Sequence, residues 1–255
     1  MTRGQIIGSV FENVGDAEHY TSNDIKITGY EDEEAWQDSG VDCDVKITRM
    51  DQGGYTCEDE VNLGWVAEYD DGKWTSWWYD LVTDDDVDPE NPIQFNYGEG
   101  LWLETPTDKL GSETFKLTSS GAVSPDDSIY PLLTRGNVVA NPMPVEIDAM
   151  DVTITGYEDE EAWQDSGVDC DVKVTLIDQG GYTCEDEVSI GWVAEYDDGE
   201  WTAWWYNLVT DDDLAREEVK FPAGLGLWVE TPTDKLGKET FHIEFPSPIA
   251  KHDAE

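Results

Sequence analysis

The sequence predicts an all-β protein made of two tandem modules of the same fold, each a β-sandwich or a partly open barrel. Three observations lead to this prediction. A long segment is repeated almost unchanged along the chain, apolar and polar side chains alternate with a period of two, and turn signals recur about every 8–12 residues.

The repeat defines the two modules. Residues 24–86 and 151–213 align without gaps and differ at only ten of 63 positions. The likeness extends to a Thr-Arg-Gly that opens each copy and to a Gly-x-Gly-Leu-Trp segment near each end. It predicts a first module over residues 1–121 and a second over 134–255. The join over 122–133 contains Ser, Pro and Asp, which are typical of a linker.

Within a module, alternation bounded by turn residues predicts each element. In the first copy the predicted elements are, in chain order, one helical turn around Trp36 (31–38), a strand over 41–48, a turn over 51–54, a strand over 55–61, a hairpin of 65–69 with 73–80, and strands over 93–97, 101–105 and 114–118. The Asp-Asp-Gly between the two alternating segments is the hairpin signal.

The last strand of the second module is more apolar than its counterpart in the first. Two interpretations of the segment 241–248 stay open. Either it pairs with the sheet edge of a neighbouring molecule, or it is the ordinary closing strand of its own module.

The charge limits the partners. With 59 acidic and 14 basic residues, the net charge is −45. Such a surface repels nucleic acid and anionic lipid and favours cations and basic partners. Adaptation to high salt is an alternative explanation. The sequence has no apolar run of about 18 residues and no signal segment at its start, so membrane insertion is not expected.

The order of motifs resembles a known kind of protein. An opening Gly-x-Ile-Ile is followed by Asp-Ile-x-Ile-x-Gly-Tyr, Asp-x-Gly-Gly, Trp-Tyr-Asp and Gly-x-Gly-Leu-Trp-Leu. This resembles the uncharacterised tandem β repeat modules of acidic bacterial secreted and surface proteins. The resemblance implies an extracellular or cell-surface location, tandem use and no enzymatic activity, and it carries no catalytic residues. The missing signal peptide and the small number of modules depart from it.

Each module has one pair of cysteines, fourteen residues apart: Cys43 with Cys57, and Cys170 with Cys184. A disulfide within each module would stabilise it by about 3 kcal/mol and would require an oxidising, extracellular setting. A simple hairpin does not place Cys43 opposite Cys57, so the bridge needs a bulge, a longer loop or a third strand. Buried thiols are the alternative, and zinc is disfavoured because no further Cys or His lies at ligand spacing.

Acidic triplets follow the aromatic strand of each module: Asp84, Asp85 and Asp86, and Asp211, Asp212 and Asp213. Carboxylates close together are ligands that Ca²⁺ prefers, although the spacing is not that of an EF-hand. A solvated acidic loop is the alternative.

The strand over 73–80 is rich in aromatic residues. These are Trp74, Trp77, Trp78 and Tyr79, copied as Trp201, Trp204, Trp205 and Tyr206. A period of two places Trp74 and Trp78 on one face and Trp77 and Tyr79 on the other. One face belongs to the core. The other is covered by a second sheet, forms a protein interface or offers a platform on which sugars stack.

No histidine general base or catalytic triad is duplicated, because His19, His242 and His252 have no counterparts in the other copy. The sequence therefore predicts a non-enzymatic structural protein of the cell surface or exterior. We expect it to associate with itself as a filament or layer subunit, assisted by Ca²⁺. A bivalent carbohydrate-binding protein is the alternative function, and a virion decoration protein is a weaker one.

Overall fold

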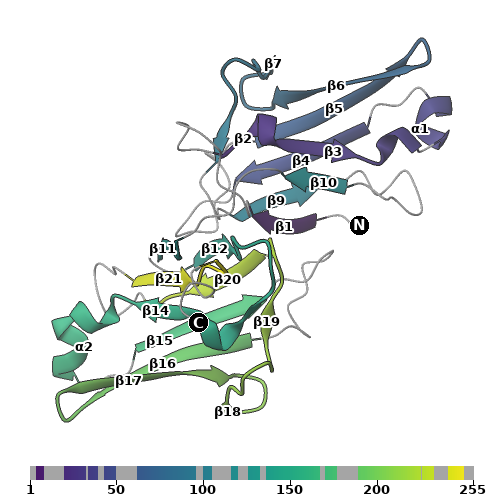
Figure 1. Ribbon diagram of the computed structural model, residues 1–255. Coiled ribbons are helices and arrows are strands. Elements are labelled where there is room, and N and C mark those ends of the chain that lie inside the picture. The colour runs from purple at the N-terminus through teal and green to yellow at the C-terminus, as the bar shows by residue number, and fades with distance from the viewer. Residues whose placement is uncertain are drawn as a thin grey trace.

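The computed structural model describes residues 4–8, 20–32, 34–39, 43–49, 62–95, 100–104, 116–119, 126–132, 136–166, 170–176, 189–224, 226–232 and 241–249. Within these residues the predicted all-β fold is confirmed: the sheets are antiparallel, and each of the two α-helices has six residues. Figure 1 shows the two modules one above the other.

The first module is built on a six-stranded sheet in the order β1-β9-β4-β5-β6-β7. Its strands are β1 (Gly4–Gly8), β9 (Gly100–Glu104), β4 (Cys43–Arg49), β5 (Asn62–Asp70), β6 (Lys73–Asp80) and β7 (Asp85–Asp86). Two small sheets accompany it: β3 (Ile25–Thr28) with β10 (Lys116–Ser119), and β2 (Tyr20–Thr21) with β8 (Gln94–Phe95).

The second module repeats this order as β12-β20-β15-β16-β17-β18. Its strands are β12 (Gly136–Ala140), β20 (Gly226–Glu230), β15 (Cys170–Leu176), β16 (Ser189–Asp197), β17 (Glu200–Asn207) and β18 (Asp212–Asp213). The smaller sheets are β11 (Ser128–Leu132), β21 (Phe241–Phe245) and β14 (Thr153–Thr155), and the pair β13 (Ile147–Asp148) and β19 (Lys220–Phe221). The repeat in sequence is therefore a repeat in topology.

The predicted helical turn is found in both modules. It consists of a 3₁₀ turn, η2 (Tyr30–Asp32) or η4 (Tyr157–Asp159), followed by α1 (Glu34–Ser39) or α2 (Glu161–Ser166). Trp36 and Trp163, on these helices, are each only 1% exposed. Helices this short are not stable alone, so the burial of the indole holds them in place. Two further 3₁₀ turns are η1 (Ser22–Asp24) and η3 (Ala149–Asp151).

The predicted hairpin is also found. Strand β5 turns into β6 through Asp71 and Gly72, whose φ angles are 48° and 77°. Asp198 and Gly199 make the same turn in the second module, at 50° and 91°. Two successive positive φ angles are those of a type I′ turn, whose twist matches that of the flanking strands.

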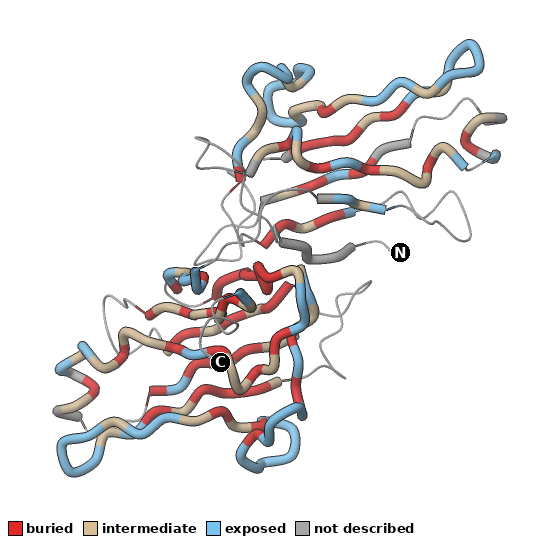
Figure 2. The backbone as a smooth tube through the Cα atoms, in the orientation of Figure 1, coloured by how far each residue is buried: buried red, intermediate tan, exposed pale blue. Residues whose placement is uncertain are grey.

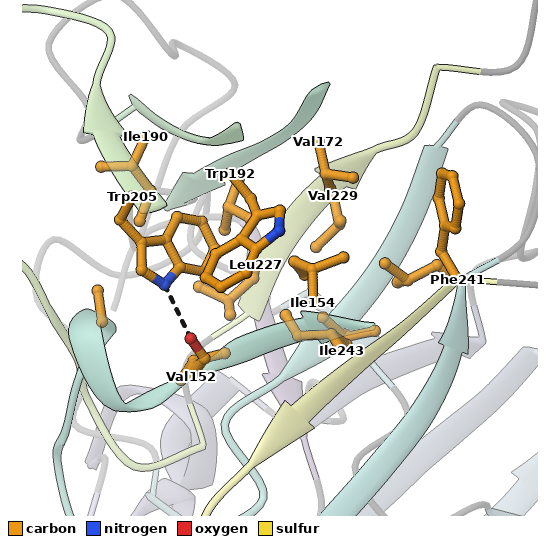
Figure 3. Close-up of a cluster of buried hydrophobic side chains, with 14 of the residues drawn as sticks. Val152, Ile154, Val172, Ile190, Trp192, Trp205, Leu227, Val229, Phe241 and Ile243 are labelled. Carbon is orange, nitrogen blue, oxygen red and sulfur yellow. Dashed lines mark hydrogen bonds between the residues drawn. The ribbon is translucent and has the colours of Figure 1, made fainter. Parts of the chain in front are cut away.

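The core of the second module lies between its large sheet and its three-stranded sheet. In Figure 3, Trp192 and Trp205 of the large sheet point toward Ile154 and Ile243 of the smaller one. The two indoles meet edge to face at 5.1 Å, and Nε1 of Trp205 donates a hydrogen bond to the carbonyl of Val152 at 2.8 Å. Two layers with a closed apolar interior are the arrangement of a β-sandwich.

Part of the predicted linker is a strand of the second module. Strand β11, from Ser128 to Leu132, pairs with β21 along its whole length. Strand β21 in turn pairs with β14, so it is the central strand of its sheet. The apolar segment 241–248 therefore contains an inner strand of its own module, and its β21 edges are not free for a neighbouring molecule.

The first module differs at the equivalent place. Its sheet β10–β3 has two strands within the described residues, and β10 carries Lys116, Thr118 and Ser119 where β21 has His242, Glu244 and Phe245. The clearest difference is Ser119 in place of the buried Phe245. In the middle of the strands, Leu117 is partly exposed, whereas Ile243 is 0% exposed.

The two modules touch through equivalent strands. Each strand of the β1–β9 pair contacts both strands of the β12–β20 pair. The two pairs have the same register, with Gly8 opposite Gly100 and Ala140 opposite Gly226. Exchanging the modules maps these strand contacts onto themselves, which is the pattern of an isologous interface, as in a two-fold symmetric dimer.

Burial of β12 agrees with this packing. All five residues of the strand are buried, on both faces, and the strand is red in Figure 2. One face meets the core of the second module, where Val139 is 1% exposed. The other face, with Val138 at 1%, meets Gly100 of the first module.

Candidate binding surface

The aromatic strands β6 and β17 divide their side chains between two faces, as the alternation predicts. Trp78 and Trp205 are 6% and 2% exposed and belong to the two cores. They were predicted as interface residues, but because the sandwich closes over them they are not accessible to a partner.

Trp74 and Trp201 also pack on the core side. Trp74 meets Tyr30 edge to face at 5.1 Å, and Trp201 meets Tyr157 at 5.0 Å. The prediction that Trp74 and Trp201 belong to an interface is therefore wrong as well, because their rings pack the 3₁₀ turn of each module against the sheet.

Trp77 and Tyr79 lie on the opposite, outer face of the first sheet, and both are partly exposed. Their cross-strand neighbours on β5 are Val66 and Gly64. In the second module the same positions are held by Trp204 and Tyr206, opposite Val193 and Gly191. Of the eight predicted interface residues, these four are the ones that face outward: Trp77, Tyr79, Trp204 and Tyr206.

A tight loop after β6 carries two exposed apolar side chains, and one of them, Leu81, packs on this face. Leu81 lies over Gly64, where an added Cβ would be 3.8 Å from its side chain. Leu81 and Val82 are 39% and 68% exposed. In the second module Leu208 and Val209 are 40% and 70% exposed. The sequence analysis did not single out these residues, because they follow the predicted strand and belong to none of its motifs. Their exact repetition inside a turn was the available signal.

The loop in the first module is held by a network of hydrogen bonds. The Asp80 carboxylate accepts from the amides of Val82 and Thr83, at 2.8 and 3.3 Å. The Tyr79 hydroxyl donates to Asp84 at 2.5 Å, and Asp84 has a positive φ of 65°. Each bond fixes the backbone that presents Val82.

The second module builds the same network with one substitution. Asn207 takes the place of the aspartate, and its side-chain oxygen accepts from Val209 at 2.9 Å and Thr210 at 3.2 Å. Tyr206 donates to Asp211 at 2.5 Å. The hydrogen bond to the Asp211 carboxylate raises the pKa of Tyr206 to about 12, and Asp84 does the same to Tyr79. Both hydroxyls are thus neutral donors at neutral pH.

The acidic triplets are exposed, but their carboxylates do not converge. Asp84 is engaged by Tyr79, and Asp85 and Asp86 are successive residues of β7, which point to opposite faces of the sheet. Among the described residues, no three His, Cys, Asp or Glu side chains are grouped as metal ligands. Ca²⁺ binding at these triplets stays a prediction.

The disulfides also stay predictions. Cys170 lies on β15 and is completely buried in the core of the second module. Cys43 lies on the equivalent strand β4. Cys57 and Cys184 fall outside the described residues.

A hollow of about 210 Å³ in the second module is lined by acids but does not form a binding site. Its Glu146 pairs with Lys220 at 3.4 Å, and its Asp151 pairs with Arg216 at 2.9 Å. Asp148 accepts from the amide of Met150. These carboxylates are therefore occupied in holding the loops together.

Comparisons with protein families, with curated proteins and with solved structures give no match to the chain. The resemblance to secreted and surface repeat modules therefore stays a prediction. In the part of the chain that the structure describes, no helix has the length and apolar character needed to cross a membrane.

Proposed function

We propose that the chain is a non-enzymatic structural protein of the cell surface or exterior, and that it assembles with further copies of itself. The observation that carries this proposal is the isologous contact between its modules. A module that packs against its own copy through β1 and β9 is a self-recognising unit.

The same contact determines which surfaces of the two modules remain available for assembly. Strands β1 and β9 are the inner end of the first sheet, and β6 and β7 are its outer end. In Figure 1, β6 and β17 accordingly lie at opposite ends of the molecule. A two-fold unit with one equal surface at each end grows into a linear polymer when those surfaces bind one another.

The net charge determines when a polymer can grow. Because each chain has a net charge of −45, two copies repel each other at low ionic strength. Screening by about 1 M salt shortens the range of this repulsion to about 3 Å, and Ca²⁺ neutralises carboxylates directly. Assembly is expected under either condition.

The test is sedimentation velocity and electron microscopy of the full chain in low salt, in 1 M NaCl, with Ca²⁺ and with EDTA. We expect species larger than the 28.6 kDa monomer, increasing with protein concentration in salt or Ca²⁺. A monomer under every condition would overturn the proposal. Assembly in salt that EDTA leaves unchanged would remove the Ca²⁺ part alone.

Carbohydrate binding is a second candidate, favoured by the outward-facing pair Trp77 and Tyr79 and its copy, Trp204 and Tyr206. Aromatic rings beside polar groups stack on sugars. Retention on insoluble polysaccharide, lost in the double variant Trp77→Ala and Trp204→Ala, would support it. Absence of retention on any polysaccharide tested would count against it.

A further inference from the structure

We propose that the contact between copies is a face-to-face pairing of one outer apolar patch with the same patch of a second chain. This inference rests on the proposed function. The patch of the first module consists of Val66, Trp77, Tyr79 and Leu81 on the sheet face, with the exposed Val82 on the adjoining loop. That of the second consists of Val193, Trp204, Tyr206 and Leu208, with Val209 on the adjoining loop.

The patch is unusual for an outer sheet face, which ordinarily carries polar side chains. Its two most exposed members, Val82 and Val209, are 68% and 70% exposed. They sit on loops fixed by the hydrogen bonds of Tyr79 and Tyr206 to the following aspartates. Apolar side chains held rigidly in water lose little entropy on binding, so they suit an interface.

A second copy is the occupant because the patch lies on the same outer sheet face through which the two modules of one chain already meet. The outer face at β9 and β12 is covered by the other module of the chain, where Gly100 meets Val138. The outer face at β5 and β6 belongs to the same sheet, and the single strand β4 separates β5 from β9.

Charges across the patch make it self-complementary. By strand register, Asp86, Tyr79, Gly64, Lys46 and Glu104 form one row across the outer face. The exposed Asp86 and Lys46 are three strands apart, about 14 Å, on either side of Gly64.

A two-fold axis parallel to the strands brings unlike charges together. It places Asp86 of one chain over Lys46 of the other, and Lys46 over Asp86. An axis across the strands would instead oppose like charges. Asp213 and Lys173 hold the equivalent positions in the second module. The positions of these charges therefore favour docking about a two-fold axis parallel to the strands.

The apolar part is tested with the double variant Val82→Asp and Val209→Asp in the full chain. We expect its self-association to weaken at least about tenfold, with an unchanged circular dichroism spectrum and Tm. Ile129→Asp is the matched control, because Ile129 is 55% exposed but lies on β11, outside the patch. Wild-type self-association retained by the double variant would overturn this inference and leave the proposed function standing.

The charged part is tested by complementary variants. One chain carries Lys46→Glu and Lys173→Glu, and the other carries Asp86→Lys and Asp213→Lys. Each alone is expected to associate at least about tenfold more weakly than wild type, whereas their equimolar mixture regains association. A mixture no better than either variant would overturn the docking direction. A wild type that stays monomeric throughout would overturn the proposed function itself, and retention on polysaccharide lost with Val82→Asp would indicate a glycan as the occupant.

Discussion

Gly100 and Val138 bring the two modules into contact at a distance that leaves no room for a side chain. A Cβ on Gly100 would lie 2.3 Å from Cγ1 of Val138 and 3.0 Å from its carbonyl oxygen. Because valine is stiff and the carbonyl belongs to the backbone, neither can move aside cheaply. Glycine at this position is therefore required by the neighbouring module.

Gly100→Ala is accordingly expected to push the modules apart, at a cost of about 1–3 kcal/mol. Small-angle X-ray scattering would detect the larger radius of gyration. Gly64→Ala is the matched control on the same sheet, since its Cβ would meet Leu81 at an ordinary 3.8 Å. Identical scattering from the two variants would contradict the packing described.

Neighbouring tryptophans on β17 should differ strongly in their contribution to stability. Trp205→Ala empties a core site that is 2% exposed and removes the donor to the Val152 carbonyl, so we expect a loss of about 3–5 kcal/mol. Trp204→Ala, on the outer face, should cost about 1 kcal/mol or less. Urea unfolding followed by circular dichroism measures both. Equal losses would mean that the two faces are wrongly assigned.

Three tyrosines should lose their protons at a higher pH than an ordinary tyrosine. The hydrogen bonds to Asp84 and Asp211 raise the pKa of Tyr79 and Tyr206 to about 12, and burial raises the pKa of Tyr157 to about 12. The unfolded value is about 10, so their stabilisation is complete below pH 10 and disappears as the pH rises from about 10 to about 12.

Absorbance at 295 nm would follow this titration. Tyr79→Phe with Tyr206→Phe should remove two of the late groups. A variant whose late phase has the wild-type amplitude would contradict the two hydrogen bonds.

Salt should stabilise the fold. With a net charge of −45, the folded chain repels itself more than the expanded one, and screening reduces this penalty. The Tm should rise by several degrees between 0.05 and 1 M NaCl, which calorimetry would measure. A Tm that falls across this range would show that attractive ion pairs dominate instead.

Hydrogen exchange should distinguish the equivalent strands β21 and β10. Strand β21 is paired on both edges, with β11 and β14, whereas β10 is paired with β3. Amides over 241–245 should therefore exchange more slowly than those over 116–119. Faster exchange in β21 would indicate that β11 is not held in place.

Local elements followed closely from the sequence. The helical turn at Trp36 and the hairpin at Asp71 and Gly72 depend on residues a few positions apart, and both were predicted. The assignment of Trp77 and Trp78 to opposite faces followed from the strand period. Which face is buried did not, because that depends on whether a second layer covers it.

Non-local features escaped prediction. Ser128–Leu132 lies in the predicted linker, and it becomes a strand because β21 offers it a hydrogen-bonding edge. Val82 is apolar yet exposed, because the Asp80 carboxylate turns its backbone outward. No pattern within these short segments records the distant partner.

The sequence by itself determined the duplication, the all-β fold and the acidic surface, because repetition, alternation and charge are properties of the chain alone. The tertiary structure decided the rest: that β1 and β9 pack on β12 and β20, and that exposed apolar side chains follow β6 and β17 at the two ends of the molecule. Burial of a face is a relation between segments far apart in the chain. It is settled only when the sheets have formed and met.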